Sequence, residues 1–80
     1  MNAQDYIDTL NKYIKKYPDA LPFSSIDLQT LERDCASLDL CIDFIIDLFS
    51  KIGVSENMAP TIDGILLDGC LEFLSEMRRS

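Results

Sequence analysis

The chain has 80 residues, 48% of them hydrophobic, and its fourteen acidic and seven basic residues give a formal net charge of −7 at pH 7. A chain of this length and apolar content forms one small globular domain, here residues 1–80. Residues 17–77 hold twelve acids and two bases, which argues against direct contact with nucleic acid or an anionic membrane, because both need a basic protein surface.

The first predicted helix covers residues 3–16. Asn2 is a favourable N-cap, and Asp5 stands three residues later, where the second partner of a capping box is found. Lysines gather toward the end of this segment, where positive charge suits the helix dipole. Pro18 then ends the helix, because a proline inside a helix removes a backbone hydrogen bond.

The central segment shows an unbroken heptad pattern of apolar residues. Its members are Leu28, Leu31, Cys35, Leu38, Ile42, Ile45, Phe49 and Ile52. Spacings that alternate between three and four place such residues on one face of an α-helix, whereas a strand needs a period of two. The pattern predicts one long helix over about residues 26–52, ended by Gly53.

A C-terminal helix is predicted over about residues 58–78, with Pro60 tolerated in its first turn. We expect Gly69 to permit close approach of this helix to the central one. The predicted fold class is all-α: a three-helix bundle in which the long central helix (about 26–52) forms an antiparallel hairpin with the C-terminal helix (about 58–78).

The two longer helices carry more apolar residues than a single neighbour covers. Four of them lie beside the main stripes: Leu40, Phe44, Leu67 and Leu71. An amphipathic helix with one covered face shows an apolar stripe about 100° wide, and these arcs are wider. Either the first helix crosses the hairpin and covers them, or they form a surface for a partner or for a second copy of the chain. The width of the arcs leads us to expect a homodimer.

Acidic residues repeat one helical turn apart on both longer helices. They are Glu32, Asp39, Asp43 and Asp47 on the central helix and Asp68, Glu72 and Glu76 on the C-terminal helix. Like charges four residues apart destabilise a helix by a few tenths of a kcal/mol. The rows are either solvated faces or a contact surface for a basic partner.

Successive carboxylates along such a row lie about 6 Å apart, a spacing similar to that of phosphates along a nucleic-acid strand. Small acidic helical proteins that phages make to inhibit host defence, including some anti-CRISPR proteins, resemble this chain in size and charge. That resemblance implies an alternative function, in which the chain mimics nucleic acid and blocks a nucleic-acid-binding complex.

A local motif suggests a weaker alternative. The segment Ala36-Ser37-Leu38-Asp39 resembles the Asp-Ser-Leu signature of acyl carrier proteins, which are also acidic, helical and of this length, although Ala36 replaces the signature aspartate. In that family the serine carries phosphopantetheine at the start of the second helix. An unbroken helix over residues 26–52 places Ser37 in mid-helix instead, so we expect no prosthetic group.

Catalysis and metal binding are not expected. Without histidine the chain lacks the usual base of Ser-His and Cys-His enzymes, and three cysteines without paired spacing form neither a zinc site nor a disulfide scaffold. We therefore expect no catalytic residue, no cofactor, no metal and a cytoplasmic protein. The favoured function is non-enzymatic binding of a protein with a basic surface, as a small adaptor, chaperone or inhibitor.

Overall fold

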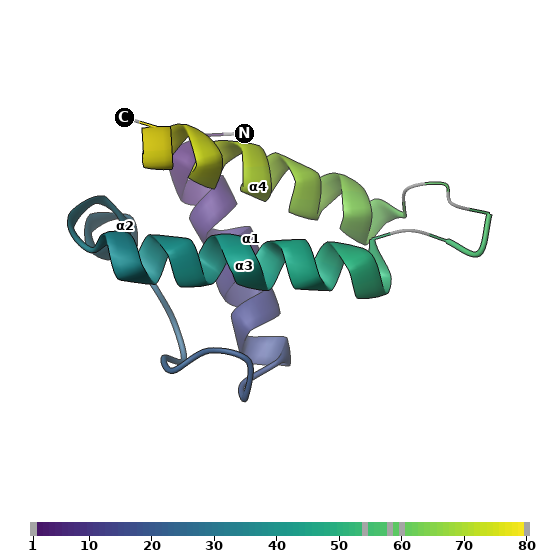
Figure 1. Cartoon of the computed structure of the whole chain (residues 1–80), viewed down its shortest axis with the longest axis horizontal. Coiled ribbons are helices and arrows are strands. Elements are labelled where there is room, and N and C mark those ends of the chain that lie inside the picture. The colour runs from purple at the N-terminus through teal and green to yellow at the C-terminus, as the bar shows by residue number, and fades with distance from the viewer. Residues whose placement is uncertain (1, 54, 58, 60, 80) are drawn as a thin grey trace.

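A computed structural model describes residues 2–53, 55–57, 59 and 61–79. Within these residues it contains four α-helices: α1 (Ala3–Lys16), α2 (Leu28–Arg33), α3 (Cys35–Ile52) and α4 (Ile62–Arg79). Helices α3 and α4 lie side by side and antiparallel, and α1 crosses behind them at a steep angle (Figure 1). The all-α bundle and its hairpin are thus confirmed. Of the described helices, none is long and apolar enough to cross a membrane.

Helix α1 has the predicted bounds and the predicted cap. The Asn2 side chain accepts a hydrogen bond from the backbone N–H of Asp5, and the Asp5 carboxylate accepts one from the backbone N–H of Asn2. This reciprocal pair satisfies two backbone donors that a helix start leaves open. The buried side of α1 consists of Ile7, Leu10, Tyr13 and Ile14.

The predicted long central helix is wrong in one respect, because it is divided at Asp34 into α2 and α3. The backbone of Asp34 is extended, and its N–H donates to the Thr30 carbonyl, which ends α2. Its carboxylate accepts from the Ala36 N–H and from the Ser37 hydroxyl, at 3.1 and 2.7 Å, which begins α3. Aspartate favours such caps because its short side chain competes with the helical backbone for hydrogen bonds.

Contacts at both ends of the hairpin between α3 and α4 show its register. At the closed end the backbone of Gly64 packs directly on the Gly53 carbonyl, and Thr61 bonds to the backbone of Ile52, Gly53 and Gly64. At the open end Arg78 Nε lies 2.8 Å from a carboxylate oxygen of Asp39. Both contacts fit one antiparallel register.

The prediction for Gly69 is wrong, because its nearest neighbour is on α1 rather than on α3. A methyl group built on Gly69 would lie 3.4 Å from the ring of Tyr6, whereas one built on Gly64 would overlap the Gly53 backbone. The glycine that permits close approach of the two longer helices is therefore Gly64. The predicted helix start at residue 58 and the position of Pro60 fall outside the described residues, and α4 begins at Ile62.

Helix α1 crosses the hairpin and covers much of the wide apolar arcs of α3 and α4. Residues from α1, the connection that follows it, α2, α3 and α4 form one buried apolar cluster. Phe44 and Leu67 belong to it, with exposed fractions of 6% and 0%. Helix α1 therefore covers the second face of the hairpin.

Tyr13 links α1 to α4 through the core. Its side chain is 2% exposed, and its hydroxyl donates to the Asp63 carboxylate at 2.6 Å. Burial, together with this hydrogen bond, raises the pKa of Tyr13 far above the ordinary value near 10. The folded protein therefore retains the phenol proton at a pH where the unfolded chain has lost it.

We accordingly expect alkaline pH to destabilise the fold through Tyr13. Because the folded-state pKa is raised, this stabilising contribution is complete below pH 10 and is lost as the pH rises above it, with a slope of up to about 1.4 kcal/mol per pH unit. Urea unfolding of wild type and Tyr13→Phe between pH 8 and 11 measures this slope. If both proteins show the same slope above pH 10, Tyr13 does not carry the effect.

Candidate protein-binding face

All seven acidic residues predicted as a contact surface are exposed: Glu32, Asp39, Asp43, Asp47, Asp68, Glu72 and Glu76. On α3, Asp39 pairs with Arg78 and Asp47 pairs with Lys51 at 2.9 Å. Both ion pairs have side chains more than half exposed, so they contribute little to stability. The carboxylates are therefore available to a partner at small cost to the fold.

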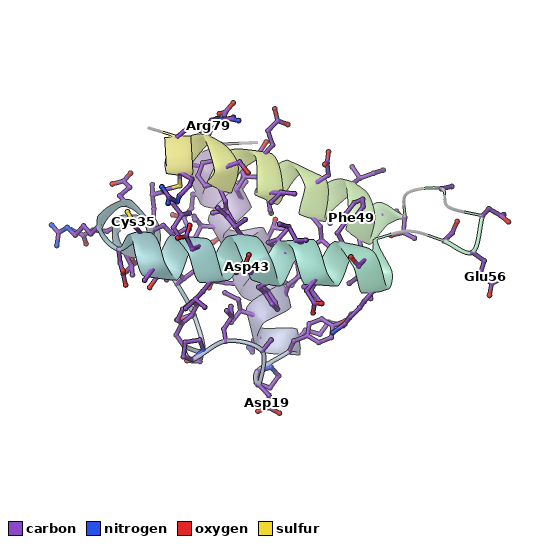
Figure 2. The ribbon with its side chains drawn as sticks, viewed as in Figure 1. Asp19, Cys35, Asp43, Phe49, Glu56 and Arg79 are labelled. Atoms are coloured by element: carbon purple, nitrogen blue, oxygen red, sulfur yellow. The ribbon has the colours of Figure 1, made fainter. Side chains whose placement is uncertain are left out.

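The hairpin register brings part of both rows to one side of the molecule. The Asp39–Arg78 pair bridges α3 and α4 on their solvent side, and Asp43 lies one turn further along α3 on the same side (Figure 2). With 3.6 residues per turn, Asp68 and Glu72 lie on the corresponding side of α4. Glu76 lies on the opposite side of α4 from Arg78, and Glu32 belongs to α2.

An apolar strip lies between these two rows. Ile46, at 49% exposed, occupies the side of α3 nearest α4, and the register places it level with Leu71. Ile42, one turn before Ile46, and Leu71 are both half-buried. We define the acidic face as Asp39, Asp43 and Asp47 of α3 with Asp68 and Glu72 of α4, flanking the strip Ile42, Ile46 and Leu71.

The apolar residues predicted for a partner or a dimer need correction. Phe44 and Leu67 are core residues and are inaccessible in the folded chain, because α1 packs on that side of the hairpin. Leu40 is 40% exposed, but it points away from α4 and so lies outside the strip. Of the four, Leu71 belongs to the face. Sequence reasoning missed Ile46. A helical wheel places it next to the face of α3 that carries the heptad residues.

Self-association of the chain remains a prediction, now without Phe44 and Leu67. The exposed large apolar residues among those described are Leu40, Ile46, Ile62 and Ile65. They are spread over two helices, and α4 contributes the two most exposed, Ile62 and Ile65, at 80% and 63%. Light scattering over a range of protein concentrations measures whether these residues suffice to form a dimer.

The division of the central helix changes the position of Ser37. With the break at Asp34, Ser37 lies in the first turn of α3, and its hydroxyl donates to the Asp34 carboxylate at 2.7 Å. This hydrogen bond lowers the pKa of Asp34. The expectation that Ser37 lies in mid-helix is therefore wrong, and with it the stated reason for excluding a prosthetic group.

The three thiols differ in accessibility. Cys41 and Cys70 are buried, at 0% and 1% exposed, and burial raises the pKa of each to about 11. Cys35, in the first turn of α3, is exposed. Within the described part of the chain, no three Cys, Asp or Glu side chains gather closely enough to hold a metal ion.

Comparisons of the chain with protein-family models, with curated proteins and with solved structures found no match.

Proposed function

We propose that the chain is a non-enzymatic protein-binding module whose acidic face contacts a partner with a basic surface. The observation that supports this most is the exposed Ile46 beside rows of carboxylates on two helices. Carboxylates around an apolar strip suit a partner that presents basic side chains around apolar ones. The charges then speed the encounter of the two proteins and orient them, and the strip contributes buried apolar surface.

A pair of charge-matched variants tests this proposal. The first, Asp43→Lys with Asp68→Lys, reverses one carboxylate in each row, and the second, Asp19→Lys with Glu56→Lys, reverses two exposed carboxylates far from the face (Figure 2). Both variants change the formal net charge from −7 to −3. We expect both variants to fold, because all four substituted carboxylates are exposed. Lys at position 43 also turns the like-charge pairs of this residue with Asp39 and Asp47 into opposite-charge pairs.

The readout is quantitative capture of partners from the native host by tagged wild type and by each variant. We expect the face variant to reduce binding of the main partner at least tenfold, about 1.4 kcal/mol, and the control to reduce it little. Wild-type binding should weaken as salt rises. Equal capture by the two variants would contradict a role for the face. A partner that itself binds nucleic acid would favour the nucleic-acid mimic.

A second function, that of a carrier protein, is favoured by the position of Ser37 in the first turn of α3. This is where the acyl carrier resemblance implies an attachment site, although Ala36 stands in place of the signature aspartate and the hydroxyl is already bonded to Asp34. Intact mass after co-expression with a broad-specificity phosphopantetheinyl transferase decides the matter. A mass gain that Ser37→Ala abolishes supports the carrier function, and an unmodified chain excludes it.

A further inference from the structure

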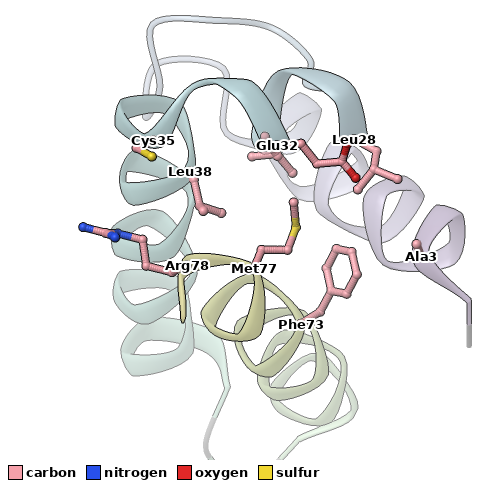
Figure 3. A pocket seen from close by; sticks show the side chains of 9 residues that line it. Ala3, Leu28, Glu32, Cys35, Leu38, Phe73, Met77 and Arg78 are labelled. Atoms are coloured by element: carbon pink, nitrogen blue, oxygen red, sulfur yellow. The ribbon is translucent and has the colours of Figure 1, made fainter. Parts of the chain in front are cut away.

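A pocket of about 400 Å³ lies where all four helices meet, away from the strip of the acidic face (Figure 3). Its walls are mostly apolar: Ala3 of α1, Leu28 and Leu31 of α2, Leu38 of α3, and Phe73 and Met77 of α4. Three polar residues complete the lining, namely Glu32, Cys35 and Arg78. This combination of apolar walls with a few polar groups is typical of a site for a small ligand.

The pocket is held open by contacts outside it. The ring of Phe73 stacks on Tyr6 with centroids 4.9 Å apart, so it does not turn into the space beside it. Asp34 caps both α2 and α3 and thereby fixes the bend that separates Leu28 from Leu38. Leu31 and Leu38, at 1% and 3% exposed, are anchored in the core.

The lining of the pocket favours an aliphatic ligand. Ala3 lies at one end and Cys35 and Arg78 lie at the other, with Met77 between them (Figure 3). Most of the walls are aliphatic side chains, which suit the aliphatic chain of a ligand. Methionine is a suitable wall residue for such a chain, because its unbranched side chain adapts to different occupants.

The charges at the pocket disfavour an anionic ligand head. Arg78 Nε is already bonded to the Asp39 carboxylate, and Glu32 adds a second carboxylate to the lining region. A ligand carboxylate or phosphate would meet these two negative charges against one guanidinium. We propose that the pocket binds the aliphatic chain of an amphiphile whose head is not anionic, and this proposal does not rest on the proposed function of the acidic face.

Cys35 provides a direct test, because its exposed thiol lines the pocket whereas Cys41 and Cys70 are buried. An alkyl methanethiosulfonate transfers its alkylthio group to the Cys35 thiolate, forming a disulfide and releasing methanesulfinate. We expect the octyl adduct to melt on the order of 5 °C above the methyl adduct, because the chain buries apolar surface. Nuclear Overhauser effects should connect the chain to Met77 and Phe73.

The matched control moves the attachment point along α3. In a Cys35→Ser, Ser50→Cys chain the thiol is again exposed on α3 but lies outside the lining of this pocket. The octyl and methyl adducts of this control should have the same melting temperature. If the octyl adduct at Cys35 is no more stable than the methyl adduct, or if the control gains as much, the proposal is overturned.

Free probes test the exclusion of an anionic head. Octyl glucoside, titrated below its micellar concentration, should shift the Met77 methyl resonance saturably, and octanoate should bind at least tenfold more weakly. Ala3→Phe, which fills one end of the pocket, should weaken octyl glucoside binding. Equal or tighter binding of octanoate would overturn the exclusion of an anionic head, and absence of any saturable shift would overturn the site.

Discussion

Replacing Gly64 with alanine is expected to lower the melting temperature by roughly 10–20 °C. The added methyl group would overlap the backbone carbonyl oxygen of Gly53, at the point where α4 meets the end of α3. A backbone group cannot turn aside as a flexible side chain can, so the two helices must separate. Overpacking of this kind costs about 3 kcal/mol or more, a large part of the stability of an 80-residue domain.

Gly69 provides the matched control on the same helix. A methyl group there would lie 3.4 Å from the Tyr6 ring, an ordinary contact. Because alanine favours a helix interior by roughly 1 kcal/mol over glycine, Gly69→Ala should leave stability unchanged or raise it. Differential scanning calorimetry of both variants measures the contrast. A Gly64→Ala protein that melts within a few degrees of wild type would show that α3 and α4 do not approach at this point.

The helices themselves were predictable from local signals, because the information lies in neighbouring residues. The cap at Asn2 and Asp5 and the stop at Gly53 are matters of a few adjacent positions. The break at Asp34 was missed because apolar spacing continues across it. A heptad reports which residues share a face, but not whether the backbone between them stays helical.

The candidate face was predictable only in part. The rows of carboxylates follow from the sequence, since each lies on a single helix. Their meeting on one side depends on the register of α3 against α4, which is set by the contact of Gly53 with Gly64 and is matched by the exposed Asp39–Arg78 pair. Such contacts join residues of different helices, and no local sequence pattern predicts them. The pocket depends in addition on the bend at Asp34.

Removal of the Asn11 amide is expected to detach the connection between α1 and α2. The Asn11 side chain donates to the Ile26 carbonyl and accepts from the Ile26 N–H, both at 2.8 Å. Ile26 is 7% exposed, so its backbone groups have little water available once the amide is gone. Leaving buried backbone groups unsatisfied costs about 1–3 kcal/mol each. Asn11→Ala should therefore lose at least about 2 kcal/mol of the free energy of unfolding.

Two further variants distinguish the loss of the two Asn11–Ile26 hydrogen bonds from the effect of shortening a side chain. Lys12→Ala shortens the next, exposed residue and should change stability little. Asn11→Asp keeps the acceptor but loses the donor, and its carboxylate repels the Ile26 carbonyl. Below an ordinary carboxyl pKa near 3.9 the protonated acid donates again. Relative to Asn11→Ala, the Asp variant should therefore gain stability as the pH falls through 4.

Urea unfolding at pH 7 and pH 3, with hydrogen exchange of the Ile26 amide, measures these effects. In wild type the Ile26 N–H should exchange slowly, because it is both buried and bonded to Asn11. In Asn11→Ala its exchange should accelerate more than that of core amides in α3, since the connection opens locally while the hairpin stays packed. Equal stability of Asn11→Ala and Lys12→Ala, with unchanged exchange at Ile26, would show that the connection is held by apolar packing alone.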